Sequence, residues 1–222
     1  MPKSFKDEDI STVIEILKER SKNWDVPIVT LTAISSKDPF KVLISTILSL
    51  RTKDETTAEA SRRLFEKADT PRKILKLSEK ELQKLIYPVG FYRVKAKNIL
   101  DICSILIKNY KSQVPDNLDE LLKFNGVGRK TANLVVSLGF GKPAICVDIH
   151  VHRISNRLGY LKTKNPFETE MKLREKLPRK YWIDYNSVLV AFGQKICRPV
   201  SPICSECAVE NYCCKVGVIK SR

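Results

Sequence analysis

The sequence contains no apolar run long enough to cross a lipid bilayer, and its first residues carry no apolar signal-peptide core. It also has no convincing strand alternation, no low-complexity linker and no internal repeat. These absences argue against membrane-spanning and repeat proteins, and we expect an intracellular protein. Histidine is scarce as well. His150 and His152 are the only two, and the single residue between them gives no obvious metal site.

Acidic residues are also in short supply. The 222-residue chain has 25 Asp and Glu against 40 Lys and Arg, which leaves a net charge of +15. Such an excess attracts polyanions, and it points to nucleic acid before an acidic membrane. The alternative is a generally basic protein, which charge alone does not exclude. A hydrophobic content of 43% suits one domain, or two small ones, with a buried core.

Nearly every segment has the apolar periodicity of a helix, so we predict an all-α fold. Asp38-Pro39 supplies a cap and a first-turn proline, and Ser78 with Glu81 forms a capping-box pattern. Gly90 is expected to break the helix that follows Ser78, and a longer helix is expected over about 92–110. The apolar stripes are Ile10, Val13, Ile14 and Leu17; Phe40, Leu43, Ile44, Ile47 and Leu48; Leu82, Leu85 and Ile86; Ala96, Ile99, Ile102, Cys103 and Leu106; Leu118, Leu121 and Leu122; and Leu134, Val135 and Leu138.

Residues 126–133 (Gly-Val-Gly-Arg-Lys-Thr-Ala-Asn) place Lys130 at the start of an apolar helix, just after a Gly-x-Gly turn. The turn and the first helical turn offer backbone N–H groups that suit a phosphate. The helix N-terminus, Arg129 and partial burial are all expected to disfavour the charge on Lys130, which makes it a candidate amine nucleophile. The alternative is a solvated lysine in a common basic turn.

Five of the seven cysteines lie near the C-terminus, and four of them have the spacing C-x6-C-x2-C-x5-C: Cys197, Cys204, Cys207 and Cys213. Four thiolates in one compact loop suit either tetrahedral zinc or an iron–sulfur cluster, and spacing alone favours zinc on frequency. Cys214 is assigned no role. Cys103 and Cys146 have apolar neighbours and are expected to be small buried residues.

The hairpin at 126–133, the segment Val147-Asp148-Ile149-His150-Val151-His152-Arg153 and the cysteine spacing together resemble the endonuclease III family of DNA glycosylases, within the helix-hairpin-helix superfamily. The resemblance covers most of the chain. It implies two helical domains with a DNA groove between them: a helical barrel over 32–142, and a discontinuous domain of 1–31 with 143–222. It also implies a 4Fe–4S cluster on the four cysteines.

The resemblance further implies a bifunctional glycosylase and AP lyase acting on oxidised pyrimidines. Lys130 matches the nucleophile that attacks the sugar C1′, and Asp148 matches the carboxylate that assists departure of the base. A helix cap ahead of Ile149 is the alternative for Asp148. His150 matches a residue near the flipped-out nucleotide, whereas His152 is expected to be structural. The alternatives for the whole chain are a monofunctional mismatch glycosylase of the same fold and a non-catalytic DNA-binding module.

The remaining expected DNA contacts also follow from the resemblance. Arg51 and Phe91 match the two wedge residues that fill the gap left by the base, where glutamine and leucine are common. The alternatives are phosphate binding for Arg51 and packing against the core for Phe91. Phe124-Asn125 replaces the usual Leu-Pro, so the preferred lesion stays open. The other expected contacts are Gly126, Val127, Gly128 and Arg129 in the turn, and Lys195, Arg198 and Lys215 near the cysteine loop. We expect a monomer that binds duplex DNA at the nucleoid, in the cytoplasm, without a membrane partner.

Overall fold

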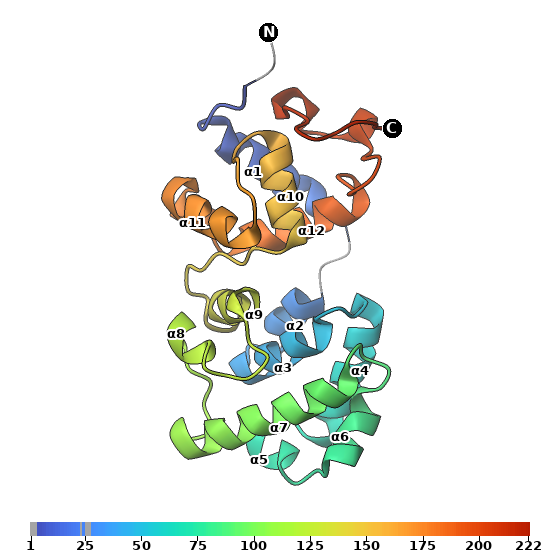
Figure 1. The fold of residues 1–222 in the computed structure, drawn as a ribbon, viewed down its shortest axis with the longest axis vertical. Coiled ribbons are helices and arrows are strands. Elements are labelled where there is room, and N and C mark those ends of the chain that lie inside the picture. Colours follow the sequence, from blue (N-terminus) through green and yellow to red (C-terminus); the bar gives the residue numbers. More distant parts are fainter. Residues whose placement is uncertain (1–3, 23, 25–27) are drawn as a thin grey trace. The chain divides into compact units, whose positions relative to one another are not determined.

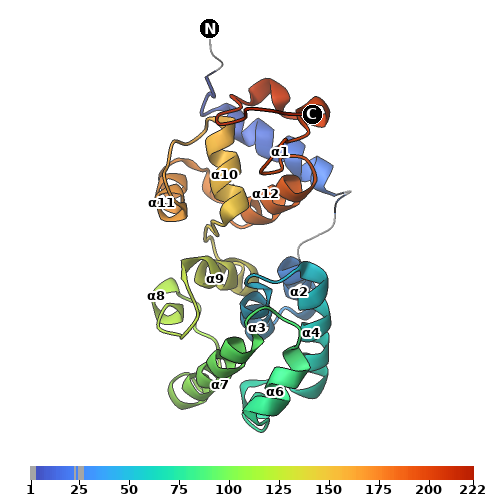
Figure 2. The ribbon, with the colours of Figure 1, turned by 45° about the vertical axis from the view of Figure 1, so that its right-hand side comes forward.

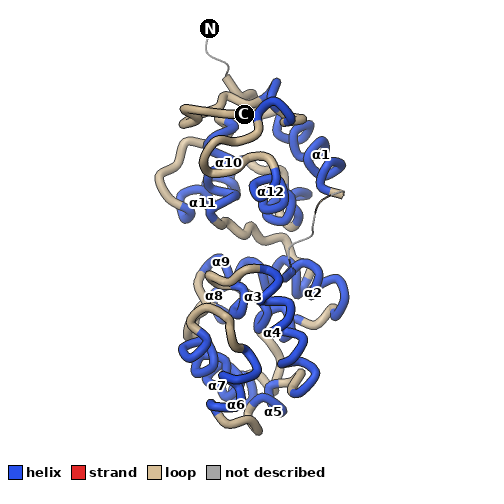
Figure 3. The backbone as a smooth tube through the Cα atoms, turned by 90° about the vertical axis from the view of Figure 1, so that its right-hand side faces the viewer, coloured by secondary structure: helices blue, strands red, loops and turns tan. Residues whose placement is uncertain are grey.

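A computed structural model describes residues 4–22, 24 and 28–222, and every regular element in this part of the chain is a helix (Figures 1 and 3). The predicted all-α fold is confirmed. Contacts divide the chain into two compact units: Met1–Pro27 with Pro143–Arg222, and Ile28–Lys142. Residues 28–31 group with the second unit, although the sequence analysis placed them with the first. Residues 1–3, 23 and 25–27 of the predicted first domain lie outside the described residues.

The unit of residues 28–142 is organised around α3 (Pro39–Ser49), which contacts most of the other elements of the unit. Its residues 42–48 are all buried. The predicted start is confirmed, because the Asp38 side chain accepts a hydrogen bond from the Phe40 N–H at 2.8 Å and Pro39 occupies the first turn. The other elements are α2 (Ile28–Ser36), α4 (Asp54–Lys67), α5 (Pro71–Ile74), α6 (Glu79–Ile86), α7 (Tyr92–Asn109), α8 (Leu118–Leu121), α9 (Arg129–Leu134) and the π-helical turn η1 (Val135–Gly139).

Helices α6 and α7 pack side by side in this unit (Figure 2). The capping box of Ser78 and Glu81 forms as predicted at the start of α6. The predicted break at Gly90 is wrong by several residues, because α6 already ends at Ile86. Tyr87 precedes Pro88, and a residue before proline is disfavoured in helical backbone. The long helix predicted over about 92–110 is confirmed as α7.

The other unit contains α1 (Asp9–Ser21), α10 (Ile149–Leu158), α11 (Pro166–Lys176) and α12 (Asp184–Lys195). Helix α12 contacts both α1 and α10, and α10 also contacts α11. The predicted apolar stripe of the first helix is confirmed: Ile10, Val13, Ile14 and Leu17 are buried in one core cluster with residues of α10 and α12. The short 3-10 helix η2 (Arg179–Tyr181) lies just before α12. After α12 the chain forms a loop that contains the 3-10 helices η3 (Cys204–Glu206) and η4 (Glu210–Tyr212). None of the described helices has the length and apolar character that a membrane span requires.

Candidate active site and cysteine loop

The predicted helix–turn–helix forms from α8, the turn at 126–128 and α9. Asn117 caps α8 by accepting a hydrogen bond from the Glu120 N–H at 2.9 Å. Gly126 has a φ of +79°, and a Cβ built on it would lie 2.4 Å from the side-chain nitrogen of Asn98 on α7. Glycine suits both this positive φ and this close approach, so Gly126 allows the turn to pack closely against α7. Gly128 is the N-cap of α9.

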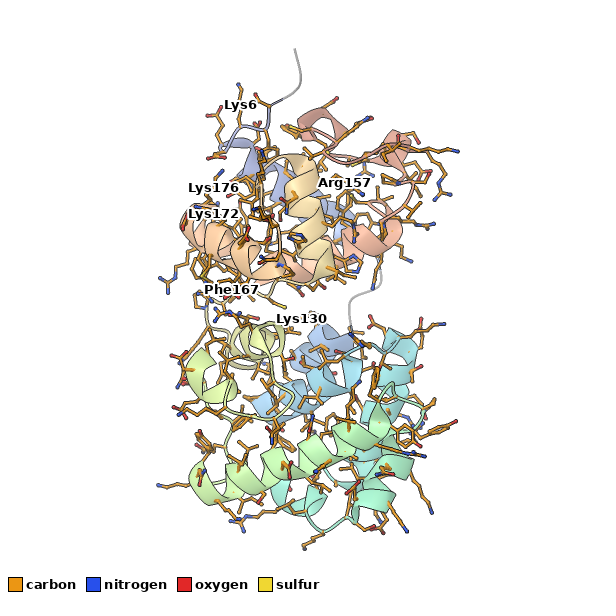
Figure 4. All side chains as sticks on the ribbon, viewed as in Figure 1. Lys6, Lys130, Arg157, Phe167, Lys172 and Lys176 are labelled. Carbon is orange, nitrogen blue, oxygen red and sulfur yellow. The ribbon has the colours of Figure 1, made fainter. Side chains whose placement is uncertain are left out.

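Lys130 is the second residue of α9 and is exposed (Figure 4). The expected partial burial of this lysine is therefore wrong. A carboxyl group that the sequence analysis did not single out lies within electrostatic range of it. Burial raises the pKa of Asp54, the first residue of α4, while a hydrogen bond from the Ile28 N–H and the charge of Lys130 act in the opposite direction. The acidic first turn of a helix was the only signal for Asp54 in the sequence, and many solvated residues give the same signal.

Asp148 is the N-cap of α10, so the helix-cap alternative describes its geometry correctly. Its Oδ1 accepts hydrogen bonds from the backbone N–H groups of His150 and Val151, both at 2.9 Å. The residue is only 9% exposed. A cap fixes the position of the carboxylate, which is compatible with a catalytic role. Asp148 and Lys130 belong to different units of the chain.

His150 and His152 have different surroundings on α10. The Nδ1 of His150 lies 3.2 Å from the Arg153 guanidinium, and a Cβ on Gly193 of α12 would come within 2.4 Å of the same nitrogen. The Nδ1 of His152 lies 2.7 Å from the Thr169 hydroxyl on α11. The structural role expected for His152 agrees with this contact, which joins α10 to α11. The predicted role of His150 beside a nucleotide stays a prediction.

Arg51 and Phe91 come together although forty residues of sequence separate them. The Arg51 guanidinium lies over the Phe91 ring, with its carbon 5.6 Å from the ring centroid. Phe91 is 61% exposed, so the alternative in which it packs against the core is wrong. Both residues have left-handed backbone, with φ values of 53° and 58°. An exposed aromatic ring stacked with a guanidinium is well suited to contact nucleic-acid bases.

The four predicted metal ligands line one cavity, which lies in the unit of α10 and α12. Burial, and then the neighbouring thiols, raise the pKa of Cys207 to about 11. The thiolate of Cys207 is therefore disfavoured until a metal compensates its charge. No three His, Cys, Asp or Glu side chains among the described residues meet closely enough to hold a single metal ion. Cys103 and Cys146 are buried, as expected.

Arg157 holds the cysteine loop on α10, a role that no sequence pattern indicated. The Arg157 side chain, labelled in Figure 4, is buried. Its guanidinium donates to the Cys197 Sγ at 3.3 Å, to the Arg198 carbonyl at 2.8 Å and to the Pro199 carbonyl at 3.0 Å. The Cys214 backbone N–H donates to the Leu158 carbonyl at 3.0 Å. This anchors the other end of the loop and gives Cys214 a structural place.

The basic residues predicted near the loop differ in their environment. Lys195, the last residue of α12, and Arg198 are both exposed. Lys215 instead forms an ion pair with Glu210, with its Nζ 2.6 Å from the carboxylate. The expectation that Lys215 is directed to phosphate is therefore not supported by its contacts.

Comparison with known proteins gives consistent matches. Residues 44–179 match the model of the HhH-GPD superfamily base excision DNA repair proteins. Endonuclease III of Thermotoga maritima is 53% identical over 79% of this chain and 83% of its own length, and that of Rickettsia conorii is 37% identical over 92% and 94%. A solved structure of a trapped endonuclease III–DNA covalent intermediate with an estranged adenine has a TM-score of 0.83 at 35% identity, covering 94% of this chain and 95% of that one.

A structure of a thermostable thymine-DNA glycosylase is similar as well, with a TM-score of 0.79 at 28% identity over 91% and 92% of the two chains. Because the superfamily model covers more than half of the chain and endonuclease III relatives match most of it, the protein belongs to the endonuclease III family of base excision DNA repair enzymes.

Proposed function

We propose that this base excision repair glycosylase and AP lyase removes oxidised pyrimidines from duplex DNA, with Lys130 as its nucleophile. The observation that carries the proposal is the position of the exposed residue Lys130 on the first turn of α9, directly after the Gly126–Gly128 turn. In the proposed reaction the Lys130 nitrogen bonds to C1′ as the bond from C1′ to the base breaks. The sugar ring then opens to a Schiff base, loss of the C2′ proton follows, and the 3′ phosphate leaves by β-elimination.

Asp148 is proposed to assist the departure of the base. Its carboxylate is held by two N–H donors of α10, so its orientation is set before DNA binds. A carboxylate so held can accept a proton and stabilise positive charge that develops on the sugar.

Duplex DNA is the proposed partner, bound by a monomer at the nucleoid. The net charge of +15 supplies the attraction for phosphates. The exposed Arg51 and Phe91 are proposed to enter the base stack, the hairpin turn to contact the backbone beside the lesion, and His150 to lie near the flipped nucleotide. Lys195 and Arg198 are proposed phosphate contacts.

A 4Fe–4S cluster is proposed for the cysteine loop. The donors fit the group, because all four cysteines line one cavity and both Arg157 and the Lys215 backbone N–H donate to ligand sulfurs at 3.3 Å. Cys197, Cys204, Cys207 and Cys213 would hold the cluster, whose proposed role is to order the loop. Iron and zinc analysis tests the assignment: a brown, iron-containing protein supports it, and a colourless protein loaded with zinc refutes it.

Borohydride trapping on abasic-site DNA tests the role of Lys130. Wild type should form a covalent adduct, and Lys130→Gln should not. Lys123→Gln is the matched control, because Lys123 is an exposed lysine of the same hairpin that contacts Glu120. Wild type that never traps refutes the mechanism. A strand-cleavage panel of thymine glycol, dihydrouracil, uracil, mismatches and abasic sites then tests the substrate class. Activity on mismatches alone would favour the mismatch-glycosylase alternative, to which the similarity with a thymine-DNA glycosylase gives support.

A further inference from the structure

The exposed pair of Arg51 and Phe91 is held in an unfavourable backbone conformation. Both residues carry a Cβ and both have φ in the left-handed region, where a Cβ crowds the backbone. Two such residues persist side by side only if their surroundings hold them firmly. The groups that hold them belong to α3, α7 and the loops that follow α3 and precede α7.

Lys95 is the buried cation behind this pair. It lies on the first turn of α7 and is only 5% exposed. Its Nζ donates to the Leu48 carbonyl at 2.9 Å, to the Leu50 carbonyl at 2.5 Å and to the Thr52 hydroxyl at 3.2 Å. An ammonium group has three hydrogens to donate, and each has an acceptor here. Two of the acceptors are carbonyls at the C-terminal end of α3, where a cation is favoured.

The Thr52 hydroxyl extends this contact to the loop that ends in Phe91. It accepts a hydrogen bond from the Gly90 N–H at 3.2 Å. The two loops also touch through their backbones, since a Cβ on Gly90 would lie 2.6 Å from the Arg51 carbonyl oxygen. Lys95, Thr52 and Gly90 thus link the loop of residues 50–53 to the loop of residues 87–91.

We propose that Lys95 is a positioning residue that joins these two loops into one rigid wedge, so that Arg51 and Phe91 enter DNA as a stacked pair. The inference rests on the proposed function and assigns separate roles to Lys95 and Lys130. Lys95 acts on the eviction of a paired base, whereas Lys130 carries out the chemistry on the sugar.

Eviction costs least when the base has no partner. A defect in the wedge should therefore slow the release of a paired lesion much more than the release of the same lesion placed opposite an abasic analogue. A purely structural role of Lys95 would change both rates by the same factor, through the fraction of folded protein.

The experiment compares Lys95→Met with Lys108→Met under single-turnover conditions. Methionine keeps the aliphatic stem and removes the ammonium, and Lys108 is an exposed lysine of the same helix, so both variants lose one charge. We expect Lys95→Met to lose on the order of tenfold in release of a guanine-paired lesion, and less than about threefold with the unpaired lesion or in borohydride trapping on a preformed abasic site. Lys108→Met should match wild type in all three assays. Equal losses on both lesions, or no loss, overturn the proposal.

Thr52 provides a second test if Lys95→Met does not fold. Thr52→Val removes the hydroxyl at nearly constant volume, and Thr52→Ser restores it. The valine variant should show the same selective loss on the paired lesion, and the serine variant should recover it; a valine variant equal to serine overturns the proposal. Wild type that neither traps nor releases a base refutes the proposed function, and the inference falls with it. Wild type that does both while the variants lose no selectivity refutes the inference alone.

Discussion

The two hydrogen bonds to Asp148 allow its cap and catalytic roles to be separated by substitution. Asparagine keeps a side-chain oxygen that accepts from the His150 and Val151 N–H groups, but it removes the carboxylate. Alanine removes both. We therefore expect Asp148→Asn to fold almost as stably as wild type and to be inactive in base release, whereas Asp148→Ala should be both unstable and inactive.

The magnitudes follow from the local contacts. Replacing an N-cap residue by alanine costs about 1–2 kcal/mol, which for a chain of this size corresponds to a fall in Tm of roughly 2–8 °C. Loss of a positioned acid or base lowers the rate by about 10²–10⁴-fold. Asp148→Asn should therefore remain within about 2 °C of the wild-type Tm while losing at least about a hundredfold in single-turnover base release.

Thermal unfolding followed by circular dichroism, together with base release from a lesion-containing duplex, measures both effects. Asn165→Ala is the matched control, because Asn165 caps α11 of the same unit by accepting from the Glu168 N–H at 2.9 Å. This variant should lose a similar amount of stability and keep its activity. If Asp148→Asn releases bases within about threefold of wild type, Asp148 is only a cap and the catalytic assignment is wrong.

Three further predictions concern the wedge, the cysteine loop and the core. Arg51 offers only donors, and the major-groove edge of guanine presents two acceptors where that of adenine presents one, so Arg51→Gln should lower the ratio of base release opposite guanine to that opposite adenine by about tenfold; an unchanged ratio contradicts this contact. Arg157→Met removes three hydrogen bonds from the cysteine loop, and the purified protein should contain less iron, absorb less visible light and lose about 1–3 kcal/mol of stability; full iron occupancy would count against the role of Arg157. Burial raises the pKa of Cys103 to about 12, so its thiol stays protonated at pH 8. Peptide mapping should find it unalkylated by iodoacetamide until guanidinium unfolds the protein, and rapid native labelling would refute its burial.

Sequence alone determined the features that depend on neighbours along the chain. Helix caps such as Asp38 and Ser78 act within three residues, and apolar periodicity predicts the buried face of a single helix, which is why these elements are confirmed. The motifs that identified the family are equally local, since the hairpin and the cysteine spacing each span a short segment. The end of α6, which was predicted at the wrong residue, shows the limit of this reasoning. Gly90 was the more visible signal for the end of the helix, but the helix ends before Pro88.

Only the tertiary structure decided which charged side chains are buried and hold the loops of the proposed site in place. Lys95 contacts the end of α3 more than forty residues away in sequence, and Arg157 reaches the loop after α12 over a similar separation. In the sequence each looks like one of many cations, because a lysine or arginine has the same local pattern whether it is solvated or buried. Burial and three fixed acceptors distinguish these two from the other lysines and arginines that the structure describes, and both features arise only when distant segments pack together.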